Sequence, residues 1–453
     1  MADDLCIGCG FCQVAVDDKG EIHPTNAKIE FDEQRSTFLA SSSSMPKNRS
    51  NRVNAGAVAD PYVVCPGRTM RLNSLYKAKY PAASSYLGSY LDTEAAYCSD
   101  NSERIKAASG GIASALVKFL LEQGIAERAY MTRNNGPRQA SAGAYMSLAE
   151  VDETIHDSIY HPTDFGAGLQ HLVSCDKPFV FVGLPCEVAA LEILMQQSKR
   201  LASRCRLTIG LFCGGINRLD GIEWYIRSMR PDLKQPLTCI RYREGYWPGH
   251  IKAEDGNASH IIARIKGNSR RRIIKYIAAF QGFFLQKRCR ICPDQVAHLA
   301  DIAVGDPHLP RFQSPTSLGV SAVVVRTERG QRYFDGLKKT GGIKTEALSA
   351  TDIIESQGYT LKNRSHSVIY VEVARKLGMA APSIEDLEIN DVDLKHRKKI
   401  PLYATIDLLK IKYRDNTVFR RLVMPLQIAE YLFIRFTPSE FFRKLRSISK
   451  DES

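Results

Sequence analysis

The stretch Phe179-Val180-Phe181-Val182-Gly183-Leu184-Pro185-Cys186 decides the fold class of this chain. It begins with a run of β-branched and aromatic residues, which is typical of a buried strand. Glycine and proline then break the strand, and a helix is predicted from Glu187 to about Gln197. The stretch Leu207-Thr208-Ile209-Gly210-Leu211-Phe212-Cys213-Gly214-Gly215 repeats this design. Further strands are predicted over 126–132, 301–305 and 321–327, so we expect a mixed α/β fold.

Both of the quoted strands lead directly to a cysteine, Cys186 in one case and Cys213 in the other. A single cysteine in such a place is more often part of the core. In open α/β sheets, however, ligands bind beside the carboxyl ends of the strands. Two cysteines in equivalent positions therefore favour a shared site.

A further pair of cysteines follows in Arg288-Cys289-Arg290-Ile291-Cys292-Pro293-Asp294. With Cys186 and Cys213 this C-x-x-C motif would complete four thiolates, which is the number that a 4Fe-4S cluster requires. A thioredoxin-type redox pair is the alternative, although the compact βαβ context of such pairs is missing.

The N-terminus carries three more cysteines in Cys6-Ile7-Gly8-Cys9-Gly10-Phe11-Cys12. The C-x-x-C-x-x-C spacing lets one short loop direct its thiolates inward, and Gly8 and Gly10 can adopt positive φ angles. The fourth ligand of such a set often precedes a proline, and Cys65-Pro66-Gly67 offers one across a long insertion. We predict a cluster on Cys6, Cys9, Cys12 and Cys65. Zinc is the main alternative, but it more often uses paired C-x-x-C motifs.

The composition is that of an ordinary globular protein, with 44% hydrophobic and 25% charged residues among 453. No apolar run is long enough for a transmembrane helix, and no secretory signal opens the chain. We therefore expect a cytoplasmic protein whose 12 cysteines are ligands or buried thiols. The net charge of +13 is spread along the chain without a nucleic-acid motif, so no nucleic acid is expected. An acidic small molecule, an acidic electron donor or an anionic lipid surface fits this charge equally well.

We expect three parts: an iron–sulfur domain over 1–70, an α/β catalytic domain over 71–362 and a basic helical extension over 363–453. The tail of the extension alternates aromatic and basic residues between 433 and 446. This pattern fits contact with a membrane surface or a partner, and equally a helix packed on the body of the protein.

Three loops of the middle part carry polar or flexible residues. Ser109-Gly110-Gly111 precedes an apolar helix, with Ser109 as its predicted N-cap, and could hold an anion such as a flavin pyrophosphate; a tight turn is the alternative. The stretch 241–249 mixes arginines and aromatics, which suits either a clamp for a planar anion or a structural hairpin. Asp306 or His308 could contact a cofactor or handle protons, or act only in a turn.

The ordered set of motifs resembles the beta-subunit family of coenzyme F-420 hydrogenases and dehydrogenases, which includes 7-hydroxymethyl chlorophyll a reductase. The matching pieces, between about residues 6 and 327, are CIGCGFC, VVCPG, AASGGIASAL, FVGLPCEVAAL, GLFCGG, RYREGYWPG, RCRICPD and ADIAVGD.

The resemblance implies a flavin-binding α/β core with a small ferredoxin-like domain, FAD, and one or two 4Fe-4S clusters. The metal ligands that it implies are the two sets Cys6, Cys9, Cys12, Cys65 and Cys186, Cys213, Cys289, Cys292. The cofactor-binding residues that we take from the matching motifs are Ser109, Gly110, Gly111, Gly183, Pro185, Gly305 and Asp306. No catalytic residue is identified.

The function that we expect is an iron–sulfur flavoprotein oxidoreductase. It would pass electrons between a ferredoxin-like or subunit partner and a small organic substrate, alone or as an oligomer. The alternative is an electron-transfer subunit of a larger hydrogenase or dehydrogenase complex with no substrate of its own. A zinc-stabilised interaction protein is a third and more distant class.

Overall fold

The computed structural model describes residues 5–41, 63–68, 75, 86–139, 143–153, 158–233, 236–256, 258–264, 270–314, 317–364, 366–383 and 400–424. All 12 cysteines lie in these ranges, and none of them forms a disulfide bond. The aromatic and basic tail between 433 and 446, and with it the predicted membrane or partner contact, lies outside the described residues.

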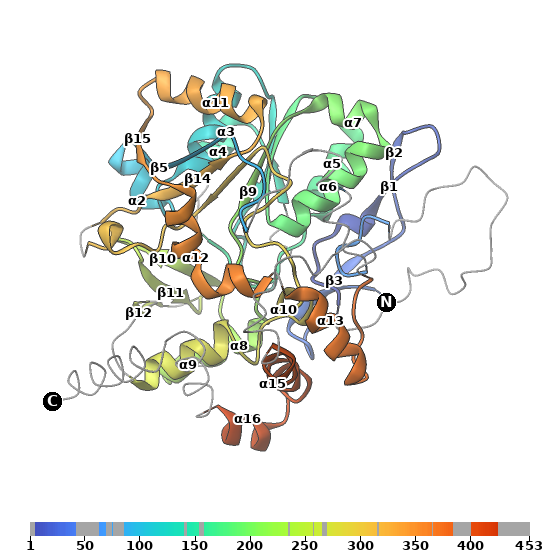
Figure 1. Cartoon of the computed structure of the whole chain (residues 1–453), viewed down its shortest axis with the longest axis vertical. Helices are drawn as coiled ribbons and strands as arrows, with labels where there is room; N and C mark the ends of the chain where they lie inside the picture. Colours follow the sequence, from blue (N-terminus) through green and yellow to red (C-terminus); the bar gives the residue numbers. More distant parts are fainter. Residues whose placement is uncertain are drawn as a thin grey trace.

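A mixed eight-stranded sheet forms the centre of the described molecule (Figure 1). Its strand order is β15-β5-β14-β13-β9-β8-β6-β7. The four inner strands β13, β9, β8 and β6 are parallel, and the outer strands are antiparallel. The strands span β5 (Asp92–Cys98), β6 (Arg128–Thr132), β7 (Gly143–Met146), β8 (Phe179–Gly183), β9 (Cys205–Leu211), β13 (Ile302–Gly305), β14 (Ser321–Val325) and β15 (Ile343–Ala347).

Helices cover both faces of this sheet, because its inner strands are apolar on both sides. In β8, Phe179 and Phe181 belong to one hydrophobic core, whereas Val180 and Val182 belong to another. The first core lies under α5 (Gly166–Ser174), α6 (Pro185–Gln197) and α7 (Lys199–Arg204). The second lies under α3 (Ile112–Glu122), α4 (Leu148–Glu153) and α11 (Glu328–Lys339). Figure 1 shows these two helical layers on either side of the strands.

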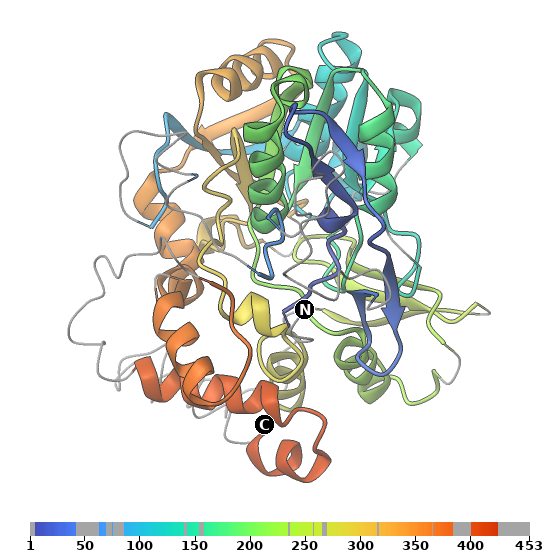
Figure 2. The same ribbon diagram turned by 90° about the vertical axis from the view of Figure 1, so that its right-hand side faces the viewer.

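The N-terminal segment packs against the α5–α6 layer (Figure 2). It contains the 3-10 helix η1 (Phe11–Gln13), the hairpin β1 (Val14–Val16) with β2 (Ile22–Pro24), and the hairpin β3 (Ile29–Asp32) with β4 (Thr37–Ala40). Phe11 joins the core of the main sheet, with its ring centroid 6.2 Å from that of Phe181. The N-terminal segment therefore shares the hydrophobic core of the α/β body, and the division into three domains stays a prediction.

Most of the remaining elements lie in the lower part of the molecule in Figure 1. A small antiparallel sheet is built from β10 (Cys239–Glu244), β11 (His250–Glu254) and β12 (Ser259–Arg264). The helices are α2 (Asn101–Lys106), α8 (Leu219–Met229), α9 (Arg270–Phe280), α10 (Lys287–Arg290), α12 (Ala350–Arg364), α13 (Ser367–Lys376), α15 (Ile400–Lys412) and α16 (Thr417–Val423), and η3 (Pro310–Phe312) is a 3-10 helix. No helix in the described ranges is long and apolar enough to cross a membrane.

The predicted mixed α/β class is confirmed, and 241–249 forms the tip of the β10–β11 hairpin. The predicted cap of α3 is wrong, because the N-cap is Gly111 with φ of 79°. Ser109 instead donates its hydroxyl to the Val320 carbonyl at 2.6 Å. Only a residue without a Cβ fits at 110, where a Cβ atom would lie 2.4 Å from the Ala96 carbonyl oxygen.

Candidate iron–sulfur sites

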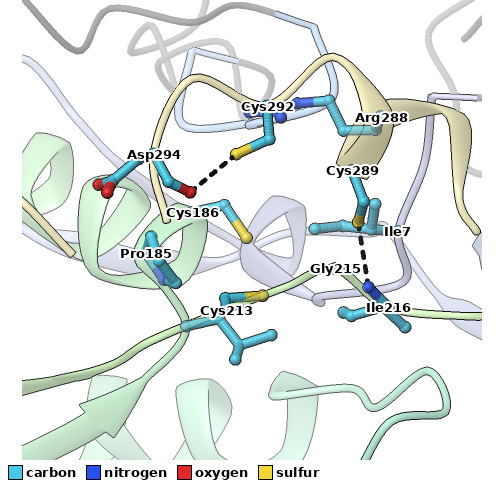
Figure 3. A pocket seen from close by; sticks show the side chains of 11 residues that line it. Ile7, Pro185, Cys186, Cys213, Gly215, Ile216, Arg288, Cys289, Cys292 and Asp294 are labelled. Atoms are coloured by element: carbon cyan, nitrogen blue, oxygen red, sulfur yellow. Dashed lines mark hydrogen bonds between the residues drawn. The ribbon is translucent and has the colours of Figure 1, made fainter. Parts of the chain in front are cut away.

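Four cysteines from separate parts of the chain line one cavity at the carboxyl edge of β8 and β9 (Figure 3). Cys186 lies in the first turn of α6, directly after β8, and Cys213 follows β9. Cys289 lies in α10, and Cys292 lies just beyond it. Their sulfurs point toward a common centre in Figure 3. These are the four cysteines that the sequence groups together, and the parallel pairing of β8 with β9 brings the first two to the same edge.

Backbone hydrogen bonds position this group, which we call the sheet-edge cysteine group. The Ile216 amide donates to the Cys289 sulfur at 3.4 Å, and the Cys292 thiol donates to the Asp294 carbonyl at 3.4 Å. The Cys213 amide donates to the Gln295 carbonyl at 2.8 Å, which ties the end of β9 to the segment after Cys292.

The surroundings of the sheet-edge group are apolar except for a few charged side chains. Burial raises the pKa of the Cys186 thiol well above its usual range, and Glu187 raises it further. The side chain of Arg288 lies beside the group, and although burial lowers its pKa, Cys292 and Cys186 raise it overall. Such thiols stay neutral unless a positive charge compensates the thiolates, as an iron or zinc ion does when it binds.

A second group, the N-terminal cysteine group, consists of Cys6, Cys9, Cys12 and Cys65. Burial is the main cause that raises the pKa of Cys9 well above its usual range, and Cys65, Cys12 and Cys6 raise it further. Burial, Cys65 and Cys6 raise the pKa of Cys12 to about 12. Each thiol thus lies within electrostatic reach of the others. Cys65 follows a long insertion in the sequence, and the structure brings it to the triplet.

Glycines make the close approach of these segments possible. Gly8 and Gly10 have φ of 74° and 80°, as the loop around the cysteines requires. A Cβ atom on Gly67 would lie 2.4 Å from the Leu5 carbonyl oxygen, so the turn after Cys65 lies directly against the chain before Cys6. The Phe165 amide donates to the Cys9 carbonyl at 3.1 Å and joins the loop to the start of α5.

Both groups offer the donor set that a cysteine-ligated iron–sulfur cluster uses. Within the residues that the structure describes, no three His, Cys, Asp or Glu side chains converge closely enough to hold a single metal ion. The sheet-edge cysteines instead line one cavity that is partly open to solvent. A cluster lies between the thiolates that bind it, and the donor chemistry of these residues fits a cluster.

The predicted cofactor-binding residues lie in two places. Pro185 lines the cavity of the sheet-edge cysteines, and Gly183 ends the strand just before it. The others lie around the carboxyl end of β13, where Ser109 is one of the side chains that lower the pKa of Asp306. Gly110 gives its amide to the Ser321 hydroxyl at 3.0 Å, and a Cβ on Gly305 would meet the Phe212 ring at 2.2 Å.

Asp306 is the centre of a buried polar network at this edge. Arg243 from the end of β10 donates to its Oδ2 at 2.6 Å, and the Trp247 indole donates to its Oδ1 at 3.4 Å. Burial opposes ionisation of Asp306, but Arg243 and His308 bring its pKa below the usual value. Arg241 is paired with Glu244 at 2.7 Å, so both arginines of the hairpin bind acidic side chains.

Sequence reasoning missed the two side chains that lie between the cysteine groups, Ile7 and Arg288. Ile7 follows Cys6 in the N-terminal loop and lines the cavity of the sheet-edge group. Arg288 is adjacent to Cys289 in sequence, which is the signal that could have drawn attention to it. The hydrogen bond from its Nε to the Pro66 carbonyl depends on the tertiary structure alone.

Comparison with known proteins identifies the family of this chain. Residues 93–161 match the N-terminal part, and residues 176–351 the C-terminal part, of the coenzyme F420 hydrogenase/dehydrogenase beta subunit. The chain belongs to this family. The sheet-edge cysteines lie within the second matched region, and the N-terminal cysteine group lies outside both.

Individual relatives are distant. The coenzyme F420 hydrogenase subunit beta of Methanococcus voltae is 23% identical over 44% of this chain and 64% of its own length. The F420-dependent formate dehydrogenase subunit beta of Methanocaldococcus jannaschii is 22% identical over 57% of this chain and 63% of its own length. The chain thus spans somewhat less than two thirds of these two relatives.

A solved structure shares the fold. A chain of the F420-reducing [NiFe] hydrogenase complex from Methanosarcina barkeri superposes with a TM-score of 0.51 at 16% identity. The superposition covers 67% of this chain and 99% of the other. The mixed sheet and its helices therefore share the fold of that chain.

Proposed function

We propose that this chain is an electron-transfer subunit of an oxidoreductase complex. The two cysteine groups of the chain would each hold a 4Fe-4S cluster. The observation that carries the proposal is the pair of four-thiol sets, each drawn from distant segments, on a fold of this family. The relatives that match are subunits of hydrogenases and formate dehydrogenases, and this favours a role beside partner subunits.

The close approach of the two groups supports transfer between them. Ile7 belongs to the loop of the N-terminal cysteine group and lines the cavity of the sheet-edge cysteine group. The side chain of Ile7 therefore spans part of the distance between the two groups. A cluster bound by thiolates takes up and releases one electron at a time. Transfer between the groups oxidises one by one electron and reduces the other, and it requires no bond or proton to move. The residues of this chain supply the ligands, the spacing and the apolar surroundings.

A second candidate is a reductase with FAD and a small organic substrate of its own. The buried network of Arg243, Trp247 and Asp306 favours it, because this network lies at the carboxyl edge of the parallel strands, where ligands bind in α/β sheets. A ferredoxin or similar carrier in the cytoplasm would then deliver the electrons.

Cofactor analysis of the full chain tests the first proposal. After anaerobic purification we expect two 4Fe-4S clusters, about eight iron and eight sulfide atoms per chain. Reduction with dithionite should produce an EPR spectrum with two cluster signals. Zinc in place of iron, or a colourless protein after reconstitution with iron and sulfide, would contradict it.

Co-purification from the native host separates the two candidates. An electron-transfer subunit should be recovered with partner subunits, and alone it should reduce only artificial acceptors. Recovery of stoichiometric FAD on a chain that reduces a small molecule by itself would favour the second candidate.

A further inference from the structure

The two cysteine groups are joined by one buried cation. Arg288 belongs to α10, and its side chain is 4% exposed. Its Nε donates to the carbonyl oxygen of Pro66, the residue directly after Cys65 of the N-terminal group. The same side chain lines the cavity of the sheet-edge group, beside Cys289 and Cys292 (Figure 3).

The charge of Arg288 acts on a thiol of each group. Burial raises the pKa of Cys65 and of Cys186, and Arg288 opposes that rise in both cases. A buried guanidinium requires negative charge or good hydrogen-bond acceptors nearby, because it has lost its water. Thiolates on both sides meet this requirement once the clusters are bound.

We propose that Arg288 is a positioning residue that links the two cysteine groups and raises the reduction potentials of the clusters on both. The inference rests on the proposed function. Reduction adds negative charge to a cluster, and a fixed positive charge beside its sulfurs stabilises that reduced form. Because Arg288 binds the turn after Cys65 of one group and lines the cavity of the other, one substitution should change both potentials together.

An EPR-monitored redox titration of the full chain tests this. Arg288→Gln keeps a hydrogen-bond donor and removes the charge, so both midpoint potentials should shift to more negative values with iron and sulfide contents unchanged. Arg288→Lys keeps the charge and should lie closer to the parent chain than Arg288→Gln does. The matched control is Arg290→Gln in the same helix, since Arg290 pairs with Asp407 at 3.4 Å. Its potentials should stay near those of the parent.

Two results would overturn the inference. Unchanged midpoint potentials in Arg288→Gln would show that the charge of Arg288 does not affect the clusters. A shift in the potential of one cluster alone would show that Arg288 does not link the two groups. If Arg288→Gln binds no iron, the Arg288→Lys variant decides. Iron in both groups of Arg288→Lys supports the role of the charge. Loss of iron from Arg288→Lys contradicts that role. A parent chain without iron and sulfide would instead overturn the proposed function.

Discussion

Single buried side chains in this protein depend on their surroundings for their charge state, and His161 is the clearest example outside the cysteine groups. The side chain is 1% exposed, and its Nδ1 lies 2.7 Å from the hydroxyl of Tyr242. Burial lowers its pKa from 6.5 to about 3, so the folded protein keeps a neutral imidazole at this position across the usual pH range.

Acid should therefore destabilise the protein partly through His161. Between pH 6.5 and about 3 the unfolded chain binds a proton here and the folded chain does not, so the free energy of unfolding falls as the pH falls. The slope for one such group approaches about 1.4 kcal/mol per pH unit. We expect His161→Gln to flatten the decline measured by urea unfolding between pH 7 and 5.

Tyr242→Phe is the control for this effect. It removes the hydrogen-bond partner but keeps the imidazole, so it should lower stability at every pH and leave the slope intact. A His161→Gln variant with the parent's slope would show that other groups cause the acid sensitivity.

At the scale of elements, a buried carboxylate joins β9, which leads to Cys213, and β13 with the helix α11. Asp301 precedes β13 and is 1% exposed. Its carboxylate accepts from the Thr208 amide in β9 at 2.9 Å and from the Thr327 hydroxyl at the start of α11 at 2.9 Å. Arg329 in α11 donates to it at 2.6 Å. This residue therefore fixes β9 and β13 in register.

Removal of the Asp301 carboxylate should destabilise the folded protein. We expect Asp301→Ala to lower the free energy of unfolding by about 3–5 kcal/mol, because it leaves buried donors and the Arg329 charge unpaired. Urea unfolding measures the loss. Asp335→Ala in α11 is the matched control, because this carboxylate is 41% exposed where it pairs with Lys338. Its loss should be about 0–1 kcal/mol. A similar small loss in Asp301→Ala would contradict a central role for that carboxylate.

At the scale of the whole molecule, the N-terminal loop and the main sheet form one packed unit. Phe11, between Cys9 and Cys12, has its ring centroid 6.3 Å from that of Phe165 and 6.2 Å from that of Phe181. The N-terminal cysteines are thus held against β8, the strand that leads to Cys186. Packing of this kind persists without a metal, so each cysteine group should lose its cluster without unfolding the other.

Single cysteine substitutions test this independence. Cys9→Ser should reduce the iron and sulfide content by about half and remove one of the two EPR signals. Cys289→Ser should remove the other signal and slow electron transfer through the chain. Circular dichroism should match that of the parent in both variants. Loss of all iron from either variant would show that the two clusters assemble together.

Local sequence predicted the strands well, and it placed the candidate ligands in short motifs. A short apolar run such as 179–182 encodes its own strand, and C-x-x-C spacing encodes a metal or redox site, because both signals lie within a few residues. The cap of α3 was wrong at Ser109, since the backbone of β5 and β14 lies too close to Gly110 for the expected turn. Such long-range crowding leaves no local signal.

The sequence by itself determined an α/β sheet with cysteines at the ends of two strands, and the resemblance of its ordered motifs determined the family. Only the tertiary structure decided which cysteines meet. Cys186 and Cys213 come together because β8 and β9 pair in parallel, and α10 brings Cys289 and Cys292 over the same edge. It also decided that Arg288 reaches Pro66, far away in the chain. Contacts of this kind follow from how the layers pack, and packing depends on the whole sequence at once.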